Sequence, residues 1–413
     1  MSFPREHLFP NVRGLGFMFH ELCLPHTSLF LSPKITRINV ELDPAPAYLP
    51  LVPLFGAKCP SLTSICLRYR GGRVEAPYHL RARAASTLIQ SLDKIRHLTA
   101  GPIDVAACGH LMSLPELKSL AVHVHEILMP EVSSESTFRY LESLEICVAR
   151  PALAFNFLPA LSKACPLNNL QIGLEEATAL ESEARQLCTV IVDCSPTSVE
   201  SLSVDFGQYS DAAAVSSDLY TVVPATLRPL LALTELVTIN VTVPFGLCLD
   251  DAFVSEMAAA WPLVQHLTLR RPYVLGEPSP PSLVTVSSLT VFALRCPDLR
   301  SLAIPLSDTP PEPVEEPPQS LRPKQTVLTL LEVMDSHIQK PFPVAAYLSS
   351  VFPNIRFVAT TRQAMDLGDN DPAPQDAEAS KRWKQVQELI PLLVGIRESG
   401  ITVGCWVWKV WSR

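Results

Sequence analysis

The stretch Cys59-Pro60-Ser61-Leu62-Thr63-Ser64-Ile65-Cys66-Leu67-Arg68 combines a proline with apolar residues at relative positions 1, 4 and 6, occupied by Leu62, Ile65 and Leu67. The same spacing returns in three other segments: Leu117, Leu120 and Val122; Leu141, Leu144 and Ile146; Leu299, Leu302 and Ile304. A pattern that recurs along a chain indicates structural units that stack on one another. The sequence therefore predicts a solenoid, in which one continuous core extends from repeat to repeat.

Thirteen candidate units can be aligned on a central apolar residue. These residues are Leu15, Ile38, Ile65, Leu98, Leu120, Leu144, Leu170, Leu202, Ile239, Leu267, Leu302, Leu331 and Val358. Their spacing is irregular and averages about 29 residues, the upper end of the range for leucine-rich repeats. We therefore predict an α/β leucine-rich-repeat solenoid of about thirteen irregular repeats, with a curved parallel sheet and helices on its outer side.

Within each unit, the end of the L-x-x-L-x-L pattern alternates as a strand does, so that positions 4 and 6 point inward and positions 3, 5 and 7 point outward. Helical spacing of apolar residues predicts returning helices between strands, for example over 81–92 and 251–261. Proline lacks an N–H group and disfavours helix in the preceding residue, so it should end each helix and start the strand. Seven units carry such a proline: Pro10, Pro33, Pro60, Pro115, Pro262, Pro297 and Pro353.

Composition changes predict three regions. Residues 1–362 form the solenoid, with a proline-rich, extended insert at 305–323. Residues 363–380 form an acidic flexible loop, and residues 381–413 form a C-terminal helix and strand that cap the stack. The expected buried face of that helix consists of Trp383, Val386, Leu389, Ile390, Leu393 and Ile396, and Pro391 should kink it.

Charge and cysteine content narrow the class of protein. The net charge of −8 and the pI near 5.7 argue against general binding to nucleic acid or to anionic membranes. Eleven cysteines without a C-x-x-C pair are typical of buried apolar positions in a reducing compartment. The chain shows no secretory leader and no membrane-length apolar run, so we expect a soluble cytoplasmic or nuclear protein.

Reactive motifs are absent from the sequence. It contains no phosphate-binding loop, nucleophile elbow, H-E-x-x-H pair or dinucleotide glycine pattern, so we predict no catalytic residue, no enzyme activity and no cofactor. Asp366, Asp369 and Asp371 suggest a calcium loop, but Ala377 stands where the twelfth-position glutamate belongs. A solvated acidic loop is the favoured interpretation. The sequon at Asn240 lies in an expected strand and is attributed to chance.

His123 and His125 lie two residues apart on an expected strand and therefore share one face. With a cysteine or a carboxylate from a neighbouring unit they could bind a metal ion. Two ligands without a spaced partner pair are weak evidence for such a site. We therefore interpret them as surface histidines and predict no metal.

The outward sheet face is the expected binding surface, since each unit places two or three side chains on it in register. Arginines near 68–73 and at 270–271 could bind a carboxylate or phosphate of a partner through paired hydrogen bonds. Ordinary solvated charges remain the alternative. The candidate partner-binding residues are Arg37, Asn39, Arg68, Arg70, His123, Glu145, Asp205, Asn240, Arg270 and Arg271.

Four features of the sequence together resemble the leucine-rich-repeat part of fungal F-box-like proteins. They are the repeated C-P-x-L-x-x-L-x-L units, the opening segment 8–15, the segment 342–355 and the later Trp383-Lys384-Gln385-Val386. In complete members of that family, an N-terminal F-box binds the Skp adaptor of a cullin–RING ubiquitin ligase. The present sequence begins within its first repeat at Leu8, so we expect the F-box to be missing and Skp binding to be doubtful.

The resemblance implies a protein-interaction scaffold that is the substrate-recognition part of such a protein, with an unknown protein partner. Two alternatives stay open at this point. One is an enzyme with a pocket between the repeats and the C-terminal cap, and the other is a truncated product without a retained role.

Overall fold

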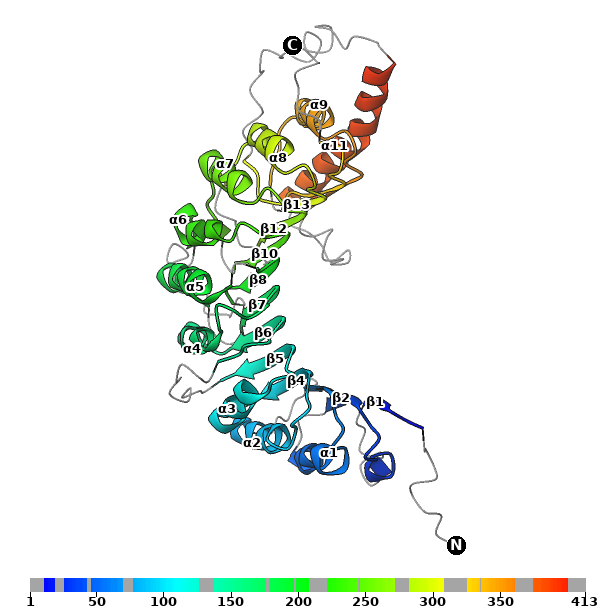
Figure 1. The fold of residues 1–413 in the computed structure, drawn as a ribbon. Helices are drawn as coiled ribbons and strands as arrows, with labels where there is room; N and C mark the ends of the chain where they lie inside the picture. Colours follow the sequence, from blue (N-terminus) through cyan, green and yellow to red (C-terminus); the bar gives the residue numbers. More distant parts are fainter. Residues whose placement is uncertain are drawn as a thin grey trace. The chain divides into compact units, whose positions relative to one another are not determined.

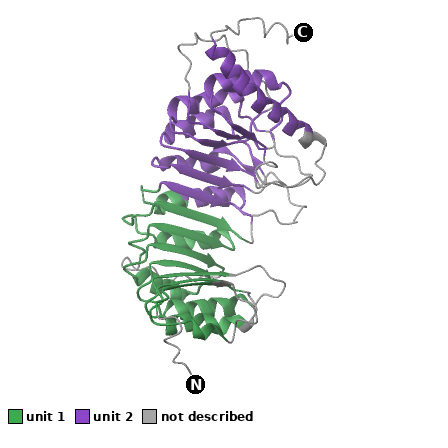
Figure 2. Ribbon diagram, turned by 90° about the vertical axis from the view of Figure 1, so that its right-hand side faces the viewer, with its two compact units in different colours: residues 1–177, 190–199 green, residues 178–189, 200–413 purple. Residues whose placement is uncertain are grey.

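The computed structural model of the 413-residue chain describes residues 11–18, 26–42, 46–69, 77–125, 137–175, 178–196, 198–207, 221–243, 246–271, 282–307, 325–334, 336–360 and 374–399 (Figure 1). The chain divides into two compact units, residues 1–177 with 190–199 and residues 178–189 with 200–413 (Figure 2). Within the described part, no helix has both the length and the apolar composition needed to cross a membrane.

Thirteen strands form a parallel sheet in the order β1-β2-β3-β4-β5-β6-β7-β8-β10-β12-β13-β14-β15. The strands of the first unit are β1 (Gly14–Met18), β2 (Arg37–Leu42), β3 (Ser64–Tyr69), β4 (His97–Pro102), β5 (Ser119–Val124), β6 (Ser143–Val148) and β7 (Asn169–Leu174). Those of the second unit are β8 (Ser201–Asp205), β10 (Thr238–Thr242), β12 (His266–Arg270), β13 (Ser301–Ala303), β14 (Leu330–Glu332) and β15 (Phe357–Ala359). The short strands β9 (Thr221–Val222) and β11 (Gly246–Leu247) form a separate parallel pair.

The register of the strands confirms the predicted repeat alignment. In the first unit, Leu15 pairs with Ile38, and the predicted central residues then follow one another in register to Leu170 on β7. In the second unit, the same ladder runs from Leu202 on β8 to Val358 on β15. The sequence pattern therefore predicted an α/β leucine-rich-repeat solenoid correctly.

Helices return the chain between most strands. The α-helices are α1 (Val52–Lys58), α2 (Tyr78–Ile89), α3 (Val105–Ser113), α4 (Pro151–Phe157), α5 (Glu181–Cys194), α6 (Pro224–Leu227), α7 (Asp251–Ala260), α8 (Thr290–Arg295), α9 (Pro341–Val351) and α11 (Pro374–Glu398). Shorter 3-10 turns are η3 (Pro46–Leu51), η4 (Leu158–Ala160), η6 (Arg228–Ala232) and η7 (Val286–Leu289). The helices predicted over 81–92 and 251–261 are observed as α2 and α7.

The repeat prolines end helices as expected. Cys59, Trp261, Cys296 and Phe352 each precede a proline and close α1, α7, α8 and α9 with φ between −126° and −119° and ψ between 62° and 73°. These angles lie outside the helical region, which a residue before proline avoids. Each of the four N–H groups still donates to the carbonyl four residues earlier, so the last turn remains hydrogen-bonded. The chain then enters the next strand.

The cysteines of the core behave as small apolar residues. The nine cysteines among the described residues are free thiols. Burial raises the pKa of Cys108, Cys188 and Cys296 to about 12 and that of Cys59 to about 11. These four thiols therefore stay protonated near neutral pH, as the sequence interpretation expected.

The proline-rich insert is shorter than predicted. Pro305, Leu306 and Ser307 belong to the packed part of the chain, because the Pro305 carbonyl accepts from Ser282 Oγ at 2.9 Å and Leu306 is buried. Residues 308–324 lie outside the described residues. The chain is anchored again at Gln325, whose Nε2 donates to the Leu299 carbonyl at 2.7 Å and whose Oε1 accepts from the Leu328 N–H at 2.8 Å.

The C-terminal helix is longer than predicted. Helix α11 begins at Pro374, inside the segment 363–380 that we expected to be a loop. Proline is favourable at the first helical position, because its missing N–H would have no intrahelical partner there. The rest of that loop (363–373) and the expected C-terminal strand (401–411) lie outside the described residues.

Helix α11 packs against the last strand and against α9 (Figure 1). Four residues of its predicted apolar face are buried, namely Trp383, Val386, Ile390 and Leu393, whereas Leu389 is partly exposed and Ile396 is exposed. Gln387 Oε1 accepts from the backbone N–H of Val358 at 2.8 Å, so a helix side chain satisfies a donor of the edge strand β15. An open sheet edge can pair with other chains, and coverage by a helix is one way to prevent this.

Candidate functional site

The candidate surface is the outward sheet face, defined here as the strand side chains at positions 3, 5 and 7 of the repeats. Burial alternates along the strands, for example in β5 and β6, where every second side chain is buried and those between them are partly or fully exposed. Most outward side chains are small or polar. Two pairs are hydrogen-bonded across strands, Asn169 Nδ2 to Ser143 Oγ at 3.0 Å and Asn240 Nδ2 to Ser203 Oγ at 3.2 Å.

The charged residues of this face in the first unit alternate in sign. Arg37 and Asn39 on β2 are exposed, as is Arg68 on β3. Glu41 stands in register with Arg68 across the β2–β3 pair, so an acidic residue adjoins the predicted basic group. Glu145 is exposed on β6. Arg70 and Arg73, the remaining members of the basic group, lie outside the described residues.

The second unit places Asp205, Asn240 and Arg270 on the outward face, all partly exposed. Burial raises the pKa of the Asp205 carboxyl, whereas the Gly207 N–H and the positive charge of Arg270 act in the opposite direction. Arg270 thus has an acidic neighbour. The face in this unit carries both signs of charge.

The prediction that Arg271 lies on the same face as Arg270 is wrong. Arg271 is only 7% exposed, whereas Arg270 is partly exposed. The two-residue period of β12 continues into Arg271 and turns this side chain toward the interior. Adjacent residues of a strand cannot both point outward, so the two arginines do not form a basic pair on this surface.

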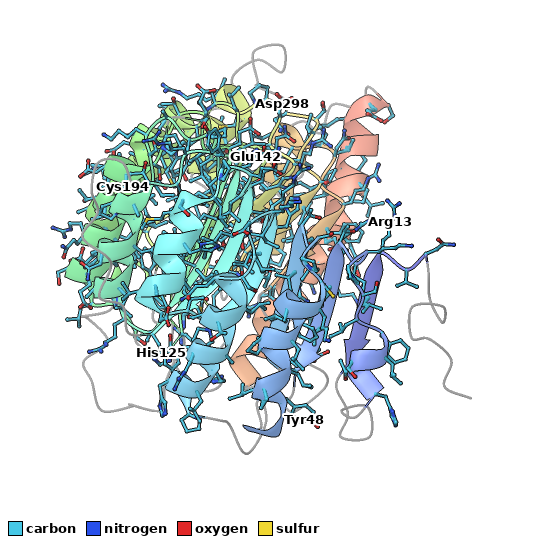
Figure 3. The ribbon with its side chains drawn as sticks, turned by 60° about the horizontal axis from the view of Figure 1, so that its bottom comes forward. Arg13, Tyr48, His125, Glu142, Cys194 and Asp298 are labelled. Atoms are coloured by element: carbon cyan, nitrogen blue, oxygen red, sulfur yellow. The ribbon has the colours of Figure 1, made fainter. Side chains whose placement is uncertain are left out.

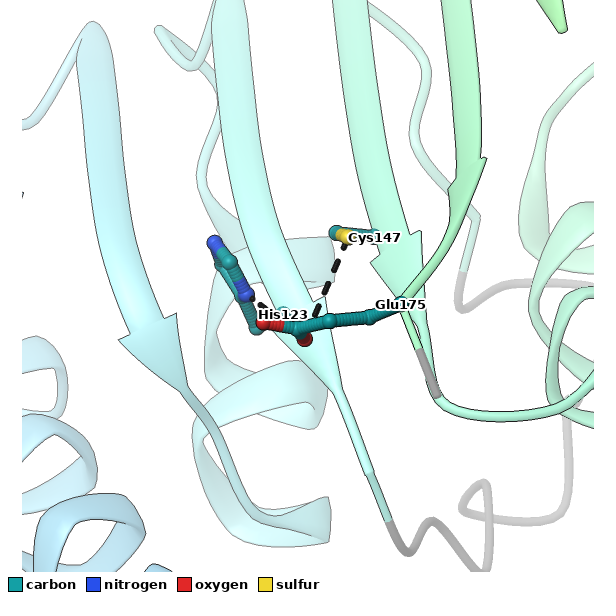
Figure 4. Close-up of side chains that lie close together, drawn as sticks. All are labelled: His123, Cys147 and Glu175. Atoms are coloured by element: carbon teal, nitrogen blue, oxygen red, sulfur yellow. Dashed lines mark hydrogen bonds and ion pairs between the residues drawn. The ribbon is translucent and has the colours of Figure 1, made fainter. Parts of the chain in front are cut away.

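Three reactive side chains meet at the carboxyl ends of β5, β6 and β7 (Figure 4). His123 and Cys147 stand in register at position 7 of their repeats, and the residue in register on β7 is Gly173. Because Gly173 has no side chain, the third place in this row is open. Glu175, two residues further along the chain, extends over it toward the other two. We call His123, Cys147 and Glu175 the strand-end triad.

The ligand atoms of the strand-end triad are close together. His123 Nδ1 lies 3.2 Å from Glu175 Oε2, and Cys147 Sγ lies 3.9 Å from the same oxygen. All three ligand atoms lie within 4.8 Å of one another. Among the described residues, no other group of three His, Cys, Asp or Glu side chains is arranged closely enough to hold a metal ion.

Electrostatics keeps Glu175 ionised. The hydrogen bond from His123 lowers the pKa of the Glu175 carboxyl, and the charges of His123, His125 and Arg81 lower it further. Partial burial acts in the opposite direction but is the smaller effect. The carboxylate is therefore present as an anion throughout the neutral range.

His125 is not part of the triad, although the sequence placed it on one face with His123. Its ring packs against Tyr78 at the start of α2, with ring centroids 4.3 Å apart. His125 is labelled in Figure 3. Its backbone N–H donates to the Tyr78 hydroxyl at 3.0 Å. The second and third members of the cluster come instead from Cys147 and Glu175. Cys147 occupies position 7, an outward position of its repeat, whereas Glu175 follows the end of its strand and was not among the predicted site residues.

Comparison with known proteins gives little further information. No family model matches the chain, and no curated protein is similar to it in sequence. Among solved structures, the chain is similar to the leucine-rich repeat-containing protein LegL7 from Legionella pneumophila, with 11% identity, coverage of 91% of this chain and 98% of that one, and a TM-score of 0.31. The assignment of a leucine-rich-repeat solenoid therefore depends on the repeat spacing and strand register of the chain itself.

Proposed function

We propose that this chain is a protein-interaction scaffold that binds its partner on the outward sheet face. The observation that supports this proposal is the row-by-row register of outward polar side chains on hydrogen-bonded strands. Backbone pairing fixes the spacing of these groups before a partner arrives, so little conformational entropy is lost on binding. The alternation of Glu41 with Arg68 and of Asp205 with Arg270 favours a protein partner that itself carries both signs of charge.

The finer proposal is that the chain is the substrate-recognition part of an F-box-type protein of a cullin–RING ubiquitin ligase. Its support is the resemblance of the repeat segments noted above. In this role the outward face binds the substrate, and an F-box brings it to the ligase. Fusion of an F-box to the N-terminus of this chain should then cause ubiquitination of the bound partner in a reconstituted Skp–cullin reaction. An unmodified partner that is still bound by the fusion would contradict the ligase role and leave the scaffold role intact.

Charge reversal on the outward face tests the scaffold role. The double variant Arg68→Glu, Arg270→Glu should reduce capture of the partner at least about tenfold. The two new glutamates would repel the acidic groups of the partner that Arg68 and Arg270 attract. The melting temperature should change little, because exposed charges contribute about 0–1 kcal/mol to stability. The measurement is quantitative proximity labelling in cells, followed by titration with the purified partner.

The matched control reverses two exposed arginines on helices, Arg83 on α2 and Arg295 on α8. This variant has the same net charge as the first and should capture the partner as the wild type does. Equal loss in both variants would indicate a general effect of net charge, and the outward face would no longer be the assigned site.

The proline-rich insert offers a second test of where binding occurs. Deletion of residues 308–323 should leave both folding and capture nearly unchanged, because loop length affects closure entropy only slowly. Pro305, Leu306 and Ser307 must be retained, since Leu306 is buried and the Pro305 carbonyl and the Ser307 N–H are hydrogen-bonded to Ser282 and Val284. Loss of capture in the deletion variant, with a melting temperature like that of the wild type, would assign recognition to the insert.

A further inference from the structure

We propose that the strand-end triad, His123, Cys147 and Glu175, is a binding site for a divalent transition-metal ion of the zinc class. The three side chains offer an imidazole nitrogen, a sulfur and a carboxylate oxygen, the donor types that zinc takes in proteins. Harder ions such as magnesium and calcium prefer oxygen donors alone, so the mixed set selects against them. This inference does not depend on the identity of the protein partner.

The observed distances are close to those of a metal site. Tetrahedral zinc, with bonds of about 2.0–2.3 Å, holds its ligand atoms roughly 3.3–3.7 Å apart. The nitrogen–oxygen and sulfur–oxygen separations are 3.2 and 3.9 Å, and the three atoms span no more than 4.8 Å. Small rotations of exposed side chains are therefore sufficient to bring all three atoms to bonding distance.

The backbone holds the triad in place. His123 and Cys147 stand on neighbouring, fully paired strands, so their spacing is fixed by the sheet. Gly173 keeps the third position of the row open, because it has no side chain; a Cβ built there would lie in van der Waals contact with Cys147 Sγ, at 3.8 Å. Glu175 is held by its backbone N–H, which donates to the Val148 carbonyl at 2.9 Å. Sites on strands are more precisely positioned than sites on loops.

The charges around the triad are compatible with a dication. On binding, the Cys147 thiol releases a proton to solvent, and the resulting thiolate and the Glu175 carboxylate neutralise the two positive charges of the metal. His125 and Arg81 are the other titratable or charged groups whose fields reach Glu175. Arg81 opposes the metal, so the affinity should be below that of structural sites with four protein ligands.

The triad is open to solvent, with His123 and Glu175 exposed and Cys147 partly exposed. Three protein ligands leave a fourth position of a tetrahedral ion for water or for a donor from outside the chain. A metal held there would stand on the same face that we propose for partner binding, at the carboxyl ends of the strands. The site itself needs no partner to form.

Calorimetric titration of the full chain with Zn²⁺ should show one site. Cys147→Ser, His123→Ala and Glu175→Gln should each lower the zinc affinity at least about 100-fold, because removal of a group that only supports a metal ligand already costs up to about that much. Co²⁺ in place of zinc should give a thiolate charge-transfer band that disappears in Cys147→Ser. The control is Cys66→Ser, which removes another partly exposed cysteine of the outward face. This variant should keep both the affinity and the band.

Unchanged zinc binding in Cys147→Ser and His123→Ala, or a cobalt complex without a thiolate band, would overturn the proposal.

Discussion

Replacement of Leu144 with Ala is expected to lower the free energy of unfolding by about 2–5 kcal/mol. Leu144 has 0% exposure and lies on β6 between Leu120 on β5 and Leu170 on β7, the central residues of the adjacent repeats. Truncation removes buried methyl groups and leaves a cavity, because backbone pairing on both sides prevents the strands from closing around it. Urea denaturation followed by circular dichroism measures this loss.

The control for Leu144 is the same substitution where the side chain is exposed. Leu294 on α8 has 64% exposure, so Leu294→Ala should change the free energy of unfolding by less than about 0.5 kcal/mol. Similar small costs for the two variants would mean that the central residues of the repeats do not form the core. The repeat interpretation of the whole chain would then be wrong.

The sequence predicted the strands well because every repeat buries its central residue in the same place. A single ladder of inward side chains, such as Ile38, Ile65 and Leu98, leaves a recurring signal even when the intervals between repeats differ. Variation in length is absorbed by the returning segments, which range from short 3-10 turns to the 14-residue helix α5. The pattern thus fixes the strands and says less about what lies between them.

The wrong predictions concern residues close to the ends of helices and strands. Arg271 was grouped with Arg270 by adjacency, although the two-residue period of β12 separates their side chains. Pro305 was assigned to the insert because prolines follow it, yet Leu306 still packs in the core. Helix α11 begins within an acidic segment whose composition alone suggested a loop. At Leu306 tertiary packing decided the outcome over local composition, whereas at Arg271 the alternation of the strand did.

The strand-end triad shows a similar limit for the candidate site. His123 and Cys147 could be brought together from sequence, since both occupy position 7 of neighbouring repeats. Glu175 directly follows the end of β7, on the side that the alternation of the strand makes outward, but only positions 3, 5 and 7 of each repeat were assigned to the outward face. Its approach depends on the backbone hydrogen bond to Val148 and on the absence of a side chain at Gly173.

Replacement of Trp383 with Ala is expected to cost about 3–5 kcal/mol and to release the C-terminal cap. Trp383 on α11 has 0% exposure, and its Nε1–H donates to the buried Ser336 carbonyl at 2.8 Å. Loss of the ring would remove the largest fully buried side chain of α11 and would free the N–H of Val358 that Gln387 now satisfies. Terminal repeats of solenoids need such coverage, because only one of their sides is packed.

Two further variants separate packing from hydrogen bonding at the cap. Trp383→Phe keeps most of the apolar volume and leaves the Ser336 carbonyl without its donor, which costs about 1–3 kcal/mol. Leu392→Ala, at a side chain of α11 with 62% exposure, should change the free energy of unfolding very little.

Hydrogen exchange provides the local readout for the cap. In Trp383→Ala, protection should be lost first in α9 and β15, the elements that α11 packs against, whereas β5 and β6 should keep their protection. A variant that loses protection equally in β5, β6 and β15, or that is as stable as Leu392→Ala, would show that α11 does not cap the sheet.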